Sequence, residues 1–282
     1  MPVETDKSTE RRKLAQRVAD ALPPDVAQEV IVTGSVSRGM ADDVSDIEML
    51  VVTPEVLPLE TCFEHARAAG LTNLGTWGPQ DTPARRVSGL REGVPVELIW
   101  WSREFAEIQL SGLLAGQVTS SADAIFHGVA LRTDGLFAEW QERLRSYPDE
   151  VATAEIEDAA LPWGGFAAEG LLTLTRPGER FALVEWMLDG AVRVVRIVFA
   201  LNRVWVPTTK RLALRVEPLP VKPDRLAERI DEALSEPDPT RALLVLTALQ
   251  LDTVELAPGG PNIDRARIWL TDGVEILRRS MR

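Results

Sequence analysis

Apolar residues in the first half of the chain follow two different periods. Some recur every three or four residues, as on one face of a helix, and others form short runs or alternate with polar residues, as in strands. These patterns predict helices over 11–22, 59–69 and 102–114 and strands over 29–33, 46–53, 85–90 and 94–101. The last two strands are joined by Arg91-Glu92-Gly93, which predicts a hairpin. Strands interleaved with helices predict a mixed sheet.

After Asp134 the pattern is helical throughout. A helix is predicted over 136–144, a long and strongly apolar helix over 181–206, and three more over 224–234, 240–256 and 264–279. The change in pattern predicts two domains, a mixed-sheet domain over 1–134 and an all-helical domain over 135–282. The expected fold class is therefore α+β, with α/β-like alternation in the first domain.

Composition limits the classes of binding partner and the cellular compartment that we expect. The 31 Lys and Arg residues against 43 Asp and Glu give a net charge of −12, which argues against a nucleic-acid partner. A single cysteine, Cys62, excludes an internal disulfide framework. No signal peptide precedes Lys13, and no apolar run approaches the roughly 20 residues of a membrane span. We expect a soluble, cytoplasmic protein with no membrane partner.

Three carboxylates lie on predicted strands. Asp46 and Glu48 are two residues apart, so their side chains share one face of a strand. Glu97 stands inside a second apolar strand, where an acid is otherwise costly. Like charges this close need a cation between them, and an oxygen-only ligand set favours Mg²⁺. The three acids therefore predict a magnesium site.

A turn just before these acids is suited to phosphate. Gly34 and Ser35 follow a predicted strand and begin a short helix, where backbone N–H groups and a hydroxyl are exposed. Arg38 adds a positive charge one turn further on. Metal-binding carboxylates beside a phosphate-binding turn predict phosphoryl or nucleotidyl transfer.

This arrangement resembles the DNA polymerase β-type nucleotidyltransferase superfamily: a Gly-Ser turn after a strand, an acid-x-acid pair 12 residues further on, and an acid on a later strand. Gly34-Ser35-Val36-Ser37-Arg38 and Ser45-Asp46-Ile47-Glu48-Met49 are most similar to the kanamycin nucleotidyltransferase branch of antibiotic-modifying enzymes, which carries Glu in the second acidic position. The resemblance is specific over residues 27–101.

The resemblance implies Mg²⁺-dependent transfer of a nucleoside monophosphate from ATP or another NTP to a hydroxyl of a small molecule, such as an aminoglycoside-like antibiotic, with release of pyrophosphate. It implies that Asp46, Glu48 and Glu97 are the metal-binding acids. It also implies that Ser35 and Arg38 contact phosphates. Because enzymes of this branch complete their sites across a dimer, a homodimer is implied as well.

The second domain adds one further pattern. Asp189, Arg193, Arg196 and Arg203 lie at offsets of 0, 4, 7 and 14 residues, which on one helix makes a narrow polar stripe. Asp189 and Arg193 would correspond to a Glu and a Lys four residues apart in the kanamycin branch. Asp189 and Glu97 are therefore two alternative candidates for the general base. Arg193 and Lys210 are candidates for phosphate binding. An Asp189–Arg193 pair together with ion pairs at a domain or subunit interface explains the stripe equally well.

Other interpretations remain open at this stage. An acid-x-acid pair alone is typical of a solvated strand end, and Asp42 and Asp43 are expected to be solvated loop acids. A toxin-like nucleotidyltransferase acting on tRNA or protein is an alternative, because residues 203–225 contain six Lys or Arg against two Asp or Glu. A non-catalytic nucleotide-binding relative is another.

Overall fold

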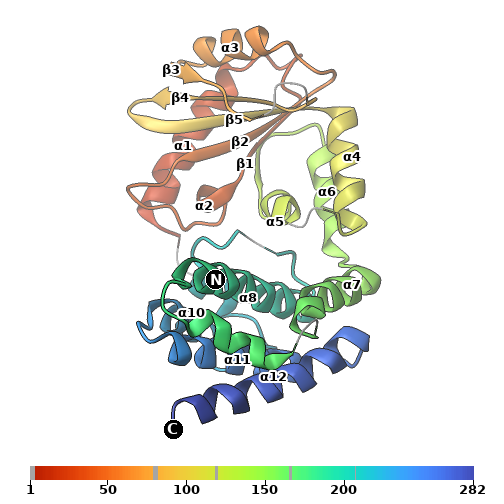
Figure 1. The fold of residues 1–282 in the computed structure, drawn as a ribbon. Coiled ribbons are helices and arrows are strands. Elements are labelled where there is room, and N and C mark those ends of the chain that lie inside the picture. Colours follow the sequence, from red (N-terminus) through yellow and green to blue (C-terminus); the bar gives the residue numbers. More distant parts are fainter. Residues whose placement is uncertain (1–3, 79–81, 118–119, 165–166, 207) are drawn as a thin grey trace. The chain divides into compact units, whose positions relative to one another are not determined.

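The computed structural model describes residues 4–78, 82–117, 120–164, 167–206 and 208–282. The chain divides into two compact units, Met1–Ser146 and Tyr147–Arg282. The first unit contains a six-stranded mixed sheet and the second is helical (Figure 1). The predicted α+β fold class is confirmed. None of the helices in the described ranges is long and apolar enough to cross a membrane.

The first unit interleaves helices and strands, as the periodicity predicted. Its helices are α1 (Asp6–Ala21), α2 (Gly34–Ser37), α3 (Leu59–Ala68), α4 (Arg103–Leu114), α5 (Ser120–Phe126) and α6 (Leu136–Arg145). Its strands are β1 (Glu29–Val32), β2 (Ile47–Thr53), β3 (Thr72–Gly75), β4 (Arg85–Arg91), β5 (Val94–Ser102) and β6 (Val129–Arg132). The first unit thus includes α6, which the sequence-based division placed in the second domain.

The strand order across the sheet is β3-β4-β5-β2-β1-β6. Neighbouring strands are antiparallel except β2 and β5, which run parallel. The hairpin predicted around Glu92 and Gly93 is present, and it joins β4 to β5. The parallel pair places the first residues of β2 and β5 side by side in the middle of the sheet.

The two faces of the sheet differ in what they bury. Ile47, Met49 and Val51 of β2 point into an apolar core shared with residues of α1 and α3. Because side chains alternate along a strand, Glu48 points to the opposite face. Further along that face, Leu50 is buried near α4, which packs against β2 and β5. On this face of β2, Glu48 near the start of the strand is thus followed by the buried apolar residue Leu50.

Three short elements of the first unit were not predicted from the sequence patterns. They are β3, α5 and β6, each of four to seven residues, whereas the short helix predicted to begin at Gly34 is present as α2. Segments this short do not complete two periods of a hydrophobic pattern, so they carry little signal. Helix α1 starts earlier than predicted, at Asp6, because the Thr5 side chain accepts a hydrogen bond from the Ser8 backbone N–H and caps the helix.

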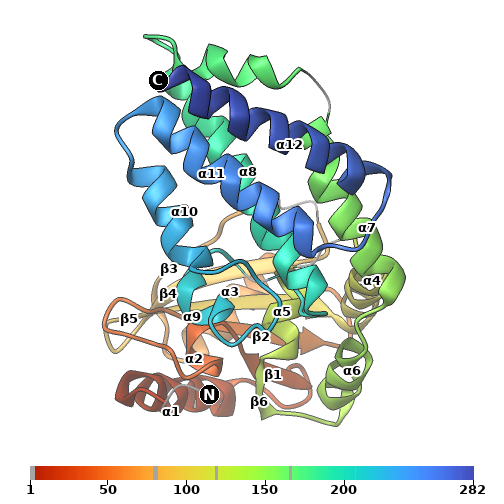
Figure 2. The same cartoon turned by 90° about the horizontal axis from the view of Figure 1, so that it is seen from below.

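The second unit is built from helices around one apolar core. They are α7 (Asp149–Ala160), the 3₁₀ helices η1 (Leu161–Gly164) and η2 (Ala168–Thr175), α8 (Arg180–Leu201), α9 (Leu212–Val216), α10 (Leu226–Ser235), α11 (Pro239–Leu256) and α12 (Pro261–Ser280). Figure 2 shows α11 and α12 running alongside each other. The predicted helices over 224–234, 240–256 and 264–279 correspond to α10, α11 and α12.

Candidate active site

Two of the predicted metal-binding acids are direct neighbours across the parallel strands. Glu48 of β2 is in register with Glu97 of β5. Residues in register on adjacent strands point to the same side of a sheet, so both carboxylates lie on the face opposite the α1 core. Asp46 precedes β2 by one residue and is half-buried, as both glutamates are. The fold therefore gathers the three acids on one side of the sheet.

Electrostatics shows that the three acids interact. The pKa of Glu97 is raised, first by burial and then by the negative charges of Glu48 and Asp46. The indole of Trp77 and the positive charge of Arg86 act to lower the pKa of Glu97, but burial and repulsion dominate. An acid that remains close to two others at such a cost is typical of a functional site.

Gly34 is required where Glu48 approaches the turn after β1. The Thr33 backbone N–H donates to the Glu48 carbonyl at 2.9 Å, which extends the β1–β2 pairing to the turn. Gly34 has φ +67°, in the left-handed region that favours glycine. A Cβ built on Gly34 would overlap Oε2 of Glu48. The glycine thus serves both the backbone turn and the close approach of the carboxylate.

Three of the predicted phosphate-binding residues, Gly34, Ser35 and Arg38, lie at this turn. Gly34 and Ser35 begin α2, and both are half-buried. Arg38 donates from Nη1 to the Gly34 carbonyl at 2.8 Å, which keeps its guanidinium beside the turn. Arg12 of α1 donates to the Val36 carbonyl at 3.1 Å. Two cations therefore stand next to the Gly-Ser turn, within a short distance of the carboxylates along the chain.

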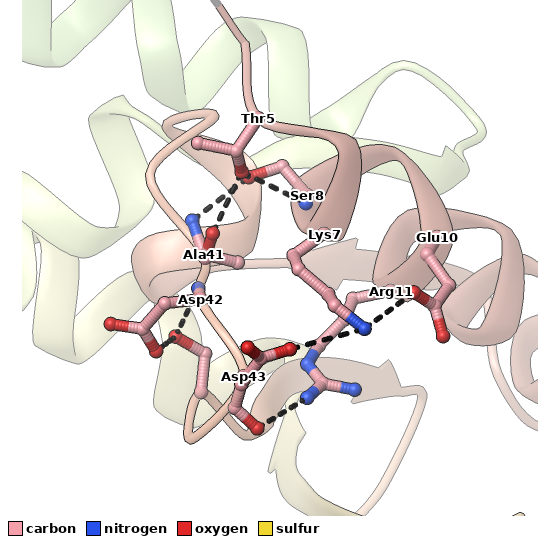
Figure 3. A network of polar contacts seen from close by, with 9 residues as sticks. Thr5, Lys7, Ser8, Glu10, Arg11, Ala41, Asp42 and Asp43 are labelled. Carbon is pink, nitrogen blue, oxygen red and sulfur yellow. Dashed lines mark hydrogen bonds and ion pairs between the residues drawn. The ribbon is translucent and has the colours of Figure 1, made fainter.

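The loop between α2 and β2 is anchored to the start of α1 (Figure 3). The Thr5 hydroxyl donates to the Ala41 carbonyl at 2.7 Å, and the Ala41 N–H donates to the Ser8 hydroxyl at 2.8 Å. Arg11 donates to the Asp43 carbonyl at 3.1 Å. These bonds fix the loop that leads into Asp46 and so position that carboxylate.

Asp42 and Asp43 also lie in this loop, and both are exposed. Asp43 is 85% exposed and pairs with Lys7 at 3.2 Å. Asp42 is exposed and accepts a hydrogen bond from the Ser45 hydroxyl at 2.8 Å. The expectation that both are solvated loop acids is confirmed.

The donor set of the acid cluster fits a divalent cation in its chemistry. All three side chains are carboxylates, which hard cations such as Mg²⁺ prefer. Oε1 of Glu97 is buried, and no residue in the described ranges forms a hydrogen bond with it. In those ranges no three acidic, His or Cys side chains are already gathered tightly enough to ligate one ion. Binding would therefore require the carboxylates to turn toward one another.

Two residues beside Glu97 were missed by the sequence analysis. Trp77, in the loop after β3, and Arg86 both act to lower the pKa of Glu97, and the Arg86 guanidinium lies 4.8 Å from the centre of the Trp77 ring. Arg86 carried a usable signal, because it stands two residues before Ser88, the β4 partner of Glu97, and so shares its face. Trp77 carried none, because it lies in a loop without periodicity.

The polar stripe predicted in the second unit consists of ion pairs within that unit. Arg193 binds Asp189 of the same helix at 2.6 Å. Arg196 binds Glu155 and Asp158 of α7, each at 2.7 Å. The predicted Asp189–Arg193 pair is present, whereas the pairs of Arg196 lie within the second unit and join neither two domains nor two subunits. Together these ion pairs account for polar residues on an apolar helix.

One part of that prediction was wrong. Helix α8 ends at Leu201 with Asn202 as its cap, so Arg203 does not continue the stripe. Arg203 has φ +55° and binds Asp149 at 2.8 Å. Lys210 follows the helix in an exposed turn. The roles of Asp189, Arg193 and Lys210 toward a substrate stay predictions.

Comparisons with known proteins add little to this geometry. No protein-family profile matches the chain, and no curated protein matches it. The chain is similar to the crystal structure, at 1.90 Å resolution, of a nucleotidyltransferase-like protein from Exiguobacterium sibiricum 255-15. The identity is 12%, the TM-score is 0.39, and the match covers 98% of this chain and 92% of that chain. A similarity this weak carries no argument about activity, so the candidate site stands on its own residues.

Proposed function

We propose that the protein is a divalent-cation-dependent nucleotidyltransferase that moves a nucleoside monophosphate from ATP or another NTP to a hydroxyl of a small molecule. The observation that carries this proposal is the register of Glu48 with Glu97 beside the Gly34 turn. The proposal is supported by this register because it would bring acids suited to a cation close to the backbone and arginine groups of the Gly34 turn, which are suited to phosphate.

The residues have distinct roles in this proposal. Asp46, Glu48 and Glu97 would hold Mg²⁺, which when bound neutralises phosphate charge and polarises the reacting phosphoryl group. Ser35 and Arg38 hold the triphosphate. The acceptor oxygen forms a bond to the α-phosphorus while the bond to the bridging oxygen breaks and pyrophosphate leaves. The hydroxyl proton passes to a carboxylate, Glu97 or Asp189.

Charge supports a neutral or cationic small acceptor. The chain has a net charge of −12, and Asp42 and Asp43 are exposed in the loop that leads to the acids. Such a surface attracts cations and repels polyanions such as tRNA. An aminoglycoside-like antibiotic has the matching charge, and its modification would confer resistance.

The test is a measurement of product and pyrophosphate. The protein is incubated with Mg²⁺, each of four α-labelled NTPs, and either a set of aminoglycosides or total tRNA. We expect label transfer to a small molecule with stoichiometric pyrophosphate release, lost in Asp46→Asn and Glu48→Gln. Asp43→Asn, an exposed acid of the adjoining loop, is the matched control and should retain turnover.

Two results would overturn the proposal. One is unchanged turnover in Asp46→Asn with the fold intact by circular dichroism. The other is NTP binding without pyrophosphate release on any acceptor, which would favour a non-catalytic nucleotide-binding protein. Label transfer to tRNA instead of a small molecule would retain the chemistry and replace the acceptor.

A further inference from the structure

Helix α8 presents a second apolar face to the solvent. Its first apolar face packs against α7 and α11 in the core of the second unit. At 100° per residue, positions 181, 184, 188 and 192 lie within about 80° of one another, so they form a straight stripe along the helix. All four residues are apolar and exposed: Phe181 (83%), Val184 (36%), Leu188 (50%) and Val192 (43%). A helix that is apolar on both faces is typical of a buried position, so this stripe requires a cover.

The outward face of α12 shows how the stripe differs from an ordinary surface. Ile268 is 68% exposed there, and its neighbours on the same face, Asp264, Arg265 and Asp272, are exposed charged residues. A single exposed apolar residue among charges is common on a monomer and needs no explanation. Four such residues in line on one helix are instead typical of a surface that another helix covers.

Charged side chains along one edge of the stripe indicate what that helix is. The edge carries two acids first, Glu185 and Asp189, and then two bases, Arg193 and Arg196. An antiparallel copy of the same helix, related by a two-fold axis, presents this order reversed along the same edge. Acids of each copy then lie opposite bases of the other, whereas a parallel copy would place like charges together.

We propose that a second copy of this chain covers the stripe, with the two α8 helices packed antiparallel about a two-fold axis at Leu188. In this register Leu188 faces Leu188 of the partner subunit, and Val184 faces Val192 of the partner subunit. The pairing is independent of the nucleotidyltransferase proposal, because the three acids of the first unit take no part in it.

Glu185 and Arg193 form the ion pair between the copies in this arrangement. With the axis at Leu188, Glu185 is offset by about 3 Å along the helix from Arg193 of the partner subunit. Glu185 is exposed and takes part in no ion pair with another described residue. Arg193 donates from Nε to Asp189 at 2.6 Å and from Nη1 to the Asp158 carbonyl at 3.4 Å. A guanidinium has five N–H donors, so others remain for a second carboxylate.

The oligomeric state of the full chain tests the pairing. Sedimentation equilibrium over a series of protein concentrations should show a monomer–dimer equilibrium and give its dissociation constant. Leu188→Lys keeps a good helix former but places two like charges at the centre of the interface, so it should weaken dimerisation at least about tenfold. Ile268→Lys, which adds the same charge at an exposed residue of α12, is the matched control and should leave the dissociation constant unchanged.

An exchange of charges tests the direction of the pairing. Glu185→Lys places a lysine opposite Arg193, and Arg193→Glu places a glutamate opposite Glu185, so each variant alone should dimerise about five- to tenfold more weakly. Mixing the two variants restores both opposite-charge pairs in an antiparallel heterodimer. With a fluorescent label on one variant, we expect this heterodimer to form with nearly the affinity of the wild type.

Three outcomes would contradict the proposal. A wild-type chain that sediments as a monomer at every concentration leaves the stripe without a second copy. A dimer that persists unchanged in Leu188→Lys is held by another surface. A dimer that Leu188→Lys weakens, but that the mixed charge variants do not restore, is not antiparallel in this register. Recovery of the heterodimer from variants that each unfold at the wild-type temperature supports the pairing, because a loss of fold could not be rescued by mixing.

Discussion

Two groups of acidic residues, one in each unit, lie in opposite electrostatic surroundings. In the first unit, Asp46, Glu48 and Glu97 share one sheet face, and the pKa of Glu97 is raised by burial and by the other two charges. In the second unit, Arg196 lies between two α7 carboxylates, and its pKa is raised by its hydrogen bond with Glu155. Like charges gather in the first case, and opposite charges are matched in the second.

The difference separates a site from a structural network. Matched charges stabilise the packing of α7 against α8, so nothing further is needed to explain them. Gathered like charges cost stability in the folded chain, and a bound cation would relieve that cost. Removing one negative charge should therefore raise stability at the acid cluster and lower it at the α7–α8 ion pairs.

The largest effect is expected where the acid cluster meets the turn. Gly34→Ala should destabilise the fold by about 2–3 kcal/mol, because an L-residue in the left-handed region costs about 1–2 kcal/mol and the new Cβ collides with the Glu48 carboxylate. Urea unfolding measures the change. Gly93→Ala is the control: its φ is +78° but nothing lies within 4 Å of its Cβ. Equal losses in both variants would show that Glu48 does not press on Gly34.

In the second unit, loss of a matched charge should be costly. Glu155→Gln leaves the half-buried Arg196 with Asp158 as its remaining carboxylate, and we expect a loss of about 1–2 kcal/mol, below the range for fully buried pairs. Glu142→Gln removes one partner of an ion pair in which both side chains are about two-thirds exposed, and should change stability by less than about 0.5 kcal/mol. If the two variants lose the same free energy, the α7–α8 pairs are not structural.

A buried acid of the first unit tests the comparison through pH. Glu29 of β1 accepts hydrogen bonds from the Thr133 hydroxyl and the Asp134 and Leu136 backbone N–H groups at 3.0–3.1 Å. Burial raises the pKa of Glu29, so its contribution to stability is present below its unfolded value of 4.5 and is lost as pH rises through the folded value. The pKa of Asp134 is lowered by its hydrogen bond with Glu29, and its contribution runs the other way.

We therefore expect Glu29→Gln, which stays neutral and keeps an acceptor oxygen, to gain stability relative to the wild type as pH rises from 4 to 8. This gain in unfolding free energy should be smaller than the loss in Glu155→Gln, because the contribution of Asp134 has the opposite dependence on pH. Unfolding free energies across that pH range measure it. A difference between the two proteins that does not change with pH would contradict the raised pKa of Glu29.

These contrasts also show what the sequence could predict. Alternation along 46–53 and 94–101 placed Glu48 and Glu97 on strand faces, and both strands are present. That the two strands pair in parallel, in register at these residues, depends on the order of the whole sheet and is not local information. Arg203 was misplaced because a continuous apolar pattern hides the end of α8. Trp77 was missed because loops have no period.

Removal of the Glu97 charge should change stability in the opposite direction to removal of the Glu155 charge. Glu97→Gln removes a charge repelled by Glu48 and Asp46, so the free energy of unfolding should rise by about 0.5 kcal/mol while binding of Mn²⁺, a probe for the divalent-cation site, is lost. Chemical unfolding and Mn²⁺ titration give the two readings. Glu92→Gln, an exposed acid on the same hairpin, should change neither. A destabilised Glu97→Gln would mean that the charge is compensated and that the cluster resembles the second unit.

The smallest effect is expected at Asp189, where the comparison bears on the choice of general base. Its side chain is half-exposed and paired with Arg193, so Asp189→Asn should cost less than about 0.5 kcal/mol. The guanidinium already binds one oxygen of this carboxylate, whereas Oε1 of Glu97 has no such hydrogen bond among the described residues, so we expect turnover in Asp189→Asn to stay within twofold of the wild type. A general base contributes about 10²–10⁴-fold to rate. A fall of that size at unchanged stability would assign the base to Asp189 and make this one acid of the second unit an exception to the matched pairs around it.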